Sequence, residues 1–180
     1  MWSKLVNIFM DTDDIRQNLP DETKMFEQVD GDWRDCQSSA INSPGVVDNC
    51  TKSKIQVLNS MFTNISKCEA ELTKYLEIKK KVFPRFYFLD SEALLDVLSN
   101  GNQPVKVEKY LNAVFNSLSM LEFLKEKDPS KTVNKAKGMY SKEHEYVAFD
   151  NGESDVTVFE AKGEVELWLC DLEYMMRISL

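Results

Sequence analysis

One short segment, Val82–Leu89, limits the fold of this chain more than any other part of its sequence. It reads VFPRFYFL and holds four aromatic residues, one proline and one arginine in eight positions. Proline fixes its own φ and disfavours the helical region for the residue before it, so the helical pattern of residues 55–81 should end at Phe83–Pro84. Arg85–Leu89 is then expected to be extended, because aromatic residues suit a pleated, half-buried surface.

The rings of this segment predict a corner where several elements dock on one aromatic cluster. Phe83, Phe86 and Phe88 are expected to be buried, each contributing about 1.5–3 kcal/mol. Arg85 is interpreted as stacking on these rings or pairing with a carboxylate, with a phosphate ligand as the less favoured alternative. The predicted structural corner consists of Phe83, Pro84, Arg85, Phe86, Tyr87 and Phe88.

The acidic balance of the chain argues against several classes of partner. Its 22 basic and 30 acidic residues give a net charge of −8. Such a chain is a poor binder of nucleic acid, anionic membrane or acidic microtubule tails, because like charges repel. No run approaches the roughly 18 apolar residues of a transmembrane helix, and the start lacks the cleavage site of a signal peptide. The apolar run up to Leu180 has no helix stop signal, which suggests a piece of a longer protein.

Cysteine and histidine are too sparse and too scattered to predict a metal centre. The cysteines form no C-x-x-C pair, and His144, the single histidine, is expected in an exposed turn without a catalytic role. Asp11–Asp14 lacks the glycine and late glutamate of an EF-hand loop, so a helix end or turn is expected there. Without a secretion signal, reduced thiols are expected at Cys36, Cys50, Cys68 and Cys170.

Hydrophobic spacing predicts mostly helices in the first half of the chain. Trp2–Phe9 predicts a short helix, Glu22–Val29 a second one, and the Ser- and Asn-rich stretch Gln37–Ser53 a mobile loop. The longest helix is expected over Ile55–Lys81, and Lys79–Lys81 in its last turn should complement the helix dipole, a phosphate site being less favoured. Its apolar stripe is interpreted as core and consists of Ile55, Leu58, Phe62, Ile65, Leu72 and Leu76.

Two further helices are predicted after the aromatic segment. Ser91 is expected to cap a helix over Glu92–Leu98, which Asn100–Gly101 ends in the left-handed conformation. Pro104 suits the first turn of the next helix. The apolar face of that helix is predicted to comprise Val107, Leu111, Val114, Phe115, Leu118, Leu121 and Leu124, with Lys125–Lys135 as a charged connector.

The last third of the sequence changes to a strand-like pattern. Gly138–Tyr140 and Tyr146–Phe149 predict two strands around the polar turn Ser141–Glu145, and Val156–Phe159 is a candidate third strand. Gly163 precedes a last helix, 164–180, with apolar residues along one side. The strands alternate with turn residues at short spacing, which is typical of a small antiparallel sheet.

The expected fold class is mainly α: an elongated helical bundle with one long helix, plus a small antiparallel β-hairpin or sheet near residues 138–159. The chain carries no phosphate loop, dinucleotide motif, nucleophile elbow or catalytic triad set. No catalytic, cofactor-binding or metal-binding residues are therefore predicted, and no cofactor. A single fragment, 1–180, is expected, with short helices and a mobile loop at 1–54, a helical bundle around the corner at 55–124, a β element at 136–160 and a final helix at 164–180.

The segment Lys67–Leu89, followed by Ser91–Gly101, resembles the linker region of dynein heavy chains. That family shows the pattern K-L-YLE-KR-FPRFYFLS-ELL-IL at this point. Later segments resemble it in the same order, and the resemblance covers nearly the whole chain. These segments are Leu121–Phe123, Gly138–Ser141 with Glu143 and Glu145, and Gly163–Leu169.

Two residues depart from the family pattern, and one segment matches none of it. Lys80 stands where the family usually has Arg, and His144 where it has Gly, so a glycine turn there would need re-routing. The stretch Gln37–Ser53 matches no part of the family pattern. Residues 99–104 and 139–143 resemble the axonemal, outer-arm type most closely.

The resemblance implies a mechanical role as the middle of a lever arm. The dynein linker is a mainly helical arm that lies across the AAA+ ring and bends as the ring cycles ATP. The implied partners are the AAA+ ring of the same heavy chain and other dynein subunits, without direct microtubule contact. The implied localisation is the cytoplasm and cytoskeleton, in the axoneme of a cilium or flagellum. Gly101 and Gly163, at element ends, are weak hinge candidates.

Two alternatives stay open beside the lever. A helical adaptor would bind a partner helix in an exposed apolar groove. A nucleotide-binding enzyme is supported only by Lys79–Lys81 and Arg85, and is the least favoured of the three.

Overall fold

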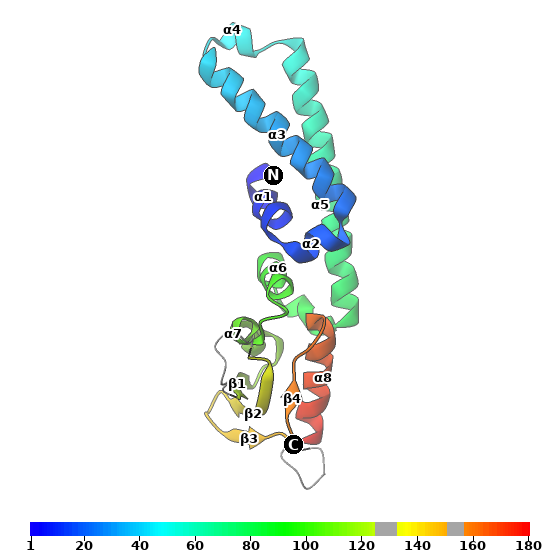
Figure 1. Cartoon of the computed structure of the whole chain (residues 1–180), viewed down its shortest axis with the longest axis vertical. Helices are drawn as coiled ribbons and strands as arrows, with labels where there is room; N and C mark the ends of the chain where they lie inside the picture. The colour runs from blue at the N-terminus through cyan, green and yellow to red at the C-terminus, as the bar shows by residue number, and fades with distance from the viewer. Residues whose placement is uncertain (125–132, 151–156) are drawn as a thin grey trace. The chain divides into compact units, whose positions relative to one another are not determined.

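The computed structural model describes residues 1–124, 133–150 and 157–180, which divide into two compact units. Unit 1 is Met1–Tyr75 and unit 2 is Leu76–Leu180. The described residues are mainly helical with one small antiparallel sheet, which confirms the expected fold class (Figure 1). The long helix α5 (Lys52–Val82) runs through the division, so its last turns belong to unit 2.

Unit 1 is helical throughout, and α3 and α5 form a hairpin with α4 in the connection between them (Figure 1). The rings of Phe9 and Phe26 stack with centroids 5.1 Å apart, which packs α1 on α3. The indole Nε1 of Trp2 donates to Asp30 over 2.9 Å and fixes the start of α1. The helices are α1 (Trp2–Asp11), α2 (Asp13–Asn18), α3 (Pro20–Asn42), α4 (Val46–Asn49) and α5 as far as Tyr75.

Helix α3 is much longer than the predicted helix Glu22–Val29, and most of the stretch Gln37–Ser53, predicted as a loop, is helical. Pro20 stands at the first helical position, where its missing N–H costs nothing, and the helix continues through Gly31 to Asn42. An interior glycine costs about 1 kcal/mol, which does not break a 23-residue helix. The second half of α3 is largely exposed, so it lacks the hydrophobic period that reveals a packed helix.

Helix α5 ends at Val82, as the proline predicts, but its apolar stripe is buried along only part of its length. Ile65 and Leu72 are buried in unit 1, whereas Ile55, Leu58 and Phe62 are exposed. The prediction that the whole stripe is core is therefore wrong for its first two turns. The buried face of α5 in unit 1 consists of Met61, Ile65, Cys68, Leu72 and Tyr75.

Unit 2 combines helices with the sheet. After the end of α5 the described residues form a short 3₁₀ helix, two α-helices, four strands and a last α-helix packed on strand β4 (Figure 1). Strand β2 is central and pairs antiparallel with β1, β3 and β4. The elements are η1 (Pro84–Phe88), α6 (Ser91–Ser99), α7 (Pro104–Val114), β1 (Leu118–Phe123), β2 (Lys135–Ser141), β3 (Tyr146–Ala148), β4 (Phe159–Glu160) and α8 (Val165–Ile178).

The structure confirms the two predicted strands and adds one that the sequence pattern missed. Strands β2 and β3 surround the predicted turn Ser141–Glu145. Leu118–Phe123 was expected to continue α7, but it forms β1, with Leu121 opposite Met139. In the candidate third strand, Val156 lies outside the described residues and β4 begins at Phe159. Most of the charged connector, 125–132, also lies outside them.

The ends of α6 differ from the predicted caps. Asp90, not Ser91, is the N-cap, and its carboxylate accepts a hydrogen bond from the backbone N–H of Ala93 over 2.7 Å. Asn100 has a φ of −104°, so the predicted left-handed end is wrong. Gly101 serves close packing instead, because an added Cβ would lie 3.0 Å from the Cβ of Val165.

Candidate functional site

The residues of the predicted aromatic corner lie in unit 2, and their backbone differs from the expected extended strand. Pro84–Phe88 is a 3₁₀ helix, in which the N–H of Phe86 donates to the carbonyl of Phe83 over 3.0 Å. Such a helix has three residues per turn, so Phe83 and Phe86 lie on the same face. Their exposed fractions are 1% and 0%, and their rings meet edge to face at 5.0 Å.

The prediction that Phe88 is buried is wrong, and the same helical period explains why. An extended segment alternates faces every second residue and would bury Phe86 together with Phe88. In the 3₁₀ helix Tyr87 and Phe88 turn outward, and the ring of Phe88 is 71% exposed. Tyr87 is held on the surface by a hydrogen bond from its hydroxyl to Glu77 over 3.0 Å.

Arg85 joins three elements of unit 2; it pairs with a carboxylate, and the ring over which it lies is Phe115, not one of the rings of its own segment. Its guanidinium donates to both oxygens of Glu173 on α8 over 3.3 Å and to the carbonyl of Val114, at the end of α7, over 3.3 Å. It also lies over the ring of Phe115 at 5.1 Å. The Arg85 guanidinium holds the pKa of Glu173 below its usual range. With these partners Arg85 is a structural joint of η1, α7 and α8.

The lysine run at the end of α5 does more than complement the helix dipole. Lys79 is buried and its ammonium contacts Glu164 and Glu166 at the start of α8, at 2.8 and 2.5 Å. Lys80 pairs with Glu77 over 2.9 Å. Since both ammonium groups already contact carboxylates, the phosphate alternative loses its support at these residues. One signal of this cluster is visible in the sequence, because Lys79 follows Leu72 and Leu76 at helical spacing, on the face of α5 that is buried.

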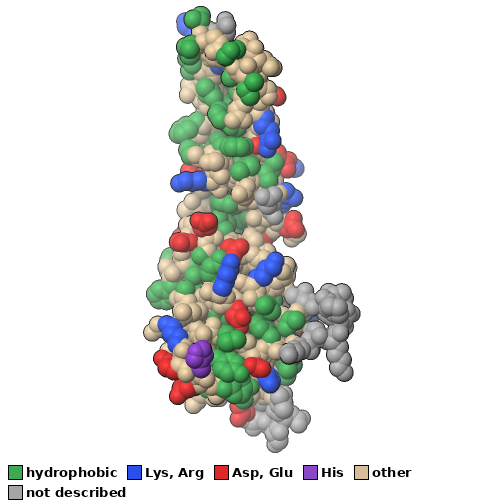
Figure 2. Space-filling view, turned by 90° about the vertical axis from the view of Figure 1, so that its left-hand side faces the viewer, with side chains coloured by type: hydrophobic (Ala, Val, Ile, Leu, Met, Phe, Trp, Pro, Cys, Tyr) green, Lys and Arg blue, Asp and Glu red, His purple; other side chains and the backbone are tan. Residues whose placement is uncertain are grey.

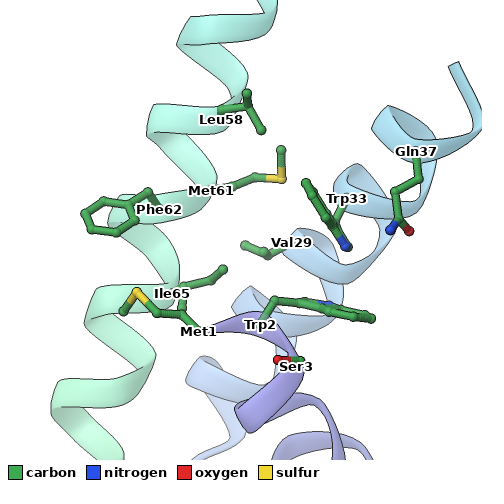
Figure 3. Close-up of a pocket in the computed structure, with 10 residues that line it drawn as sticks. All are labelled: Met1, Trp2, Ser3, Val29, Trp33, Gln37, Leu58, Met61, Phe62 and Ile65. Carbon is green, nitrogen blue, oxygen red and sulfur yellow. The ribbon is translucent and has the colours of Figure 1, made fainter. Parts of the chain in front are cut away.

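Unit 1 contains an apolar pocket of about 450 Å³ between α3 and α5, at the start of α1. Figure 3 shows Trp33 from α3 and Leu58 and Met61 from α5 directed into the space above Trp2. The indole Nε1 of Trp33 is buried and has no hydrogen-bond partner among the described residues. The lining consists of Met1, Trp2, Ser3, Val29, Trp33, Gln37, Leu58, Met61, Phe62 and Ile65, and none of these side chains is charged.

The described residues offer little for catalysis or for cofactor binding. Within them, no group of three or more His, Cys, Asp or Glu side chains is placed to hold a metal ion. His144 lies exposed on the surface of unit 2 (Figure 2). No helix in the described ranges is long and apolar enough to cross a membrane. The four cysteines are free thiols.

Comparison with known proteins places these features in a family. Residues 1–180 match the family described as "Dynein heavy chain, N-terminal region 2". The chain belongs to the dynein heavy chain family. It is 39% identical over 180 residues to "Dynein axonemal heavy chain 17" of Mus musculus, which covers 99% of this chain and 4% of that protein.

Other relatives are ciliary or flagellar dyneins. "Dynein beta chain, ciliary" of Heliocidaris crassispina is 39% identical over 180 residues, covering 99% of this chain and 4% of the relative. "Dynein beta chain, flagellar outer arm" of Chlamydomonas reinhardtii is 35% identical over 182 residues, again 99% and 4%. The chain thus spans about 4% of the length of the curated relatives it matches, and it represents part of the N-terminal, linker region of a dynein heavy chain, outside the ATPase domains.

Proposed function

We propose that this dynein segment is part of the mechanical lever of the motor and takes no part in catalysis itself. As a lever it transmits the ATP-driven changes of the AAA+ ring of the same heavy chain into the power stroke along microtubules. Its site of action is the axoneme of a cilium or flagellum, since the relatives named above are ciliary and flagellar dyneins. A lever must resist bending, and close-packed joints supply that stiffness.

The joint at Arg85 is the observation that carries this proposal. One guanidinium connects η1 with the end of α7 and with α8, and it lies over the ring of Phe115, which in turn contacts the ring of Phe83. A planar, bidentate arginine fixes orientation as well as distance, which a single point charge does not. Force applied to one of these elements is therefore passed to the others without rearrangement of side chains.

The test replaces Arg85 with lysine in the whole motor. Lysine keeps the charge but loses the fork, so the joint should soften while the fold is retained. We expect microtubule gliding velocity to fall more than the ATPase rate. Tyr87→Phe is the matched control, because it removes one exposed hydrogen bond from the same 3₁₀ helix. Equal losses of velocity and ATPase in Arg85→Lys, or no loss of either, would show that the joint transmits no force.

A second measurement addresses the absence of catalysis. Thermal unfolding of the chain should be unchanged by magnesium ATP or ADP. A nucleotide present at 100 times its Kd would stabilise the fold by about 2.7 kcal/mol, which is readily detected. A clear upward shift of the unfolding temperature would reveal a nucleotide site in this segment and refute the passive lever.

The apolar pocket of unit 1 favours a helical adaptor as a second candidate function. Figure 2 shows hydrophobic side chains on the surface of the helical hairpin, and Phe62 beside the pocket is 61% exposed. A partner helix with an uncharged, apolar face would fit such a groove. Phe62→Asp should then leave this segment folded but remove a partner polypeptide from the purified heavy-chain complex. A complex of unchanged composition would dismiss the adaptor.

A further inference from the structure

The cluster of Lys79, Glu164 and Glu166 has an imbalance of charge that the lever function does not explain. Glu164 is the residue before α8 and Glu166 lies in its first turn, while Lys79 comes from the last turns of α5. All three residues belong to unit 2. Lys79 and Glu166 are 7% and 3% exposed, whereas the side chain of Glu164 is largely in solvent. One buried ammonium therefore faces two carboxylates.

One oxygen of this cluster lacks a partner. Oε1 of Glu166 contacts the Lys79 ammonium, but Oε2 is buried and has no hydrogen-bond partner among the described residues. A buried, charged carboxylate oxygen that accepts no hydrogen bond costs free energy of folding, and a buried acid in this situation usually binds a proton and becomes neutral. A proton on Oε2 turns this acceptor into a donor, and the Glu164 carboxylate is the nearest group of the cluster able to accept it.

We propose that the Lys79–Glu164–Glu166 cluster is a proton-binding site, in which Glu166 carries a proton that it donates to the Glu164 carboxylate. The protonated cluster holds one ammonium and one carboxylate, so its buried charge is balanced and the orphan oxygen is satisfied. Loss of the proton leaves an excess negative charge between the end of α5 and the start of α8. The ligand class of this site is the proton itself, and exposed Glu164 is its route to solvent.

The surrounding groups support this placement of the proton. Burial raises the pKa of Glu166, and the neighbouring Glu164 carboxyl raises it further against the opposing effect of Lys79. The neighbouring Glu166 and Lys79 lower the pKa of Glu164. On α8 the thiol of Cys170 is one turn away, and its pKa is raised mainly by burial. Gly101, which approaches α8 at Val165, brings no ionisable side chain.

The direction of the pH dependence follows from these two carboxyls. The raised pKa of Glu166 means that its contribution to stability is present below the pKa of an unfolded glutamate and is lost as the pH rises through the folded value. The lowered pKa of Glu164 acts in the opposite sense: its contribution is lost as the pH falls through the folded value. The joint between α5 and α8 is therefore strongest in weak acid and loosens toward alkaline pH.

The first test is a carboxyl-carbon NMR titration of the 180-residue chain labelled at glutamate. The Glu166 resonance, assigned by its loss in Glu166→Gln, should titrate at a higher pH than a glutamate in an unfolded peptide. This measurement uses the unaltered protein and does not depend on the lever function. A Glu166 carboxyl that titrates at or below the unfolded value would overturn the proposal.

The second test measures urea unfolding between about pH 5 and about pH 8. The unaltered chain should lose stability as the pH rises, and Glu166→Gln, which imitates the protonated acid, should remove that loss. Glu92→Gln is the matched control, since Glu92 stands in the first turn of α6 as Glu166 does in α8. It should keep the pH dependence of the unaltered chain. A pH dependence that persists in Glu166→Gln, or vanishes equally in Glu92→Gln, would place the proton elsewhere.

Discussion

Replacing Phe86 with alanine should destabilise unit 2 by about 3–5 kcal/mol, the usual cost of truncating a buried phenylalanine. The ring is 0% exposed, so the whole side chain is lost from the core. About 0.5–1.5 kcal/mol of this loss comes from the edge-to-face pair with Phe83, whose centroid lies 5.0 Å away. Since the free energy of unfolding of a domain is about 5–15 kcal/mol, the substitution should remove a large share of the stability of unit 2.

Phe88→Ala is a matched control for this substitution. It removes the same side chain from the same 3₁₀ helix, but the ring of Phe88 is 71% exposed. Exposed substitutions that break no cap or pair usually change stability by less than about 0.5 kcal/mol. The two variants remove the same side chain and differ in its burial, so a difference in stability between them reports burial. An extended corner, in which both rings are buried, predicts similar losses of stability for both.

The assay must report on unit 2 separately, because a chain with two units need not unfold in one step. Fluorotryptophan labelling provides this, since Trp168 is buried in α8 while Trp2 and Trp33 lie in unit 1. The urea midpoint of the Trp168 fluorine signal should fall sharply in Phe86→Ala and hardly at all in Phe88→Ala. If Phe86→Ala moved the Trp168 midpoint no further than Phe88→Ala, the three-residue period of the corner would be refuted.

Two further predictions concern glycine packing and acid stability. Gly31→Ala should stabilise α3 by about 0.5–1 kcal/mol, because an added Cβ meets nothing within 4 Å. Gly101→Ala should destabilise unit 2 by about 1–3 kcal/mol, because the added Cβ presses on Val165. The unfolding temperature should therefore rise in the first variant and fall in the second. Arg85→Met should move the acid-unfolding midpoint to higher pH. Glu173, whose pKa Arg85 lowers, contributes stability that is lost as the pH falls through its folded value. Without Arg85 much of that contribution is already missing at neutral pH, so less acid is needed to unfold unit 2.

Elements whose ends are marked by proline were predictable from the sequence. Pro84 ends α5 and Pro104 begins α7, because a residue that fixes φ and lacks an N–H acts through its own backbone. Strand β1 was not predictable in the same way. Leu118 and Leu121 are both buried although they are three residues apart, because register shifts on either side of Met120–Leu121 displace the alternation. A strand with such irregularities imitates the spacing of a helix.

In the candidate site, the ion pairs of Lys79 and Arg85 join residues that are far apart in the sequence. The position of Lys79 on the buried stripe of α5 indicates that a cation is buried, and a buried cation requires a carboxylate. Its partner Glu166 is 87 residues away, and no local pattern selects it from the other acidic residues. Arg85 is similar, since its carboxylate partner Glu173 lies 88 residues further on. The type of partner was predictable from burial and charge, while its identity came from the tertiary fold.

The turn between β2 and β3 offers a test of how this chain departs from its family. His144 stands where the resemblance places glycine, and the turn needs no re-routing, because His144 itself adopts a φ of 64°. Its N–H still donates to the carbonyl of Ser141 over 3.1 Å, so the backbone bonds of the turn are kept. The left-handed conformation costs a side chain about 1–2 kcal/mol, while glycine avoids that cost and loses about 0.5–1 kcal/mol in entropy.

His144→Gly should therefore stabilise the turn by roughly 0.5–1 kcal/mol, the difference between these two terms. His144→Val should destabilise it by about 1 kcal/mol or more, because a β-branched residue tolerates positive φ poorly. The Trp168 fluorine midpoint in urea measures this order in unit 2. The reasoning fails if the valine variant is as stable as the chain with His144, or if the glycine variant is the least stable of the three. Either result would mean that the positive φ of residue 144 does not decide the stability of this turn. The expected order, glycine above histidine above valine, follows from the backbone alone, since the histidine side chain is exposed.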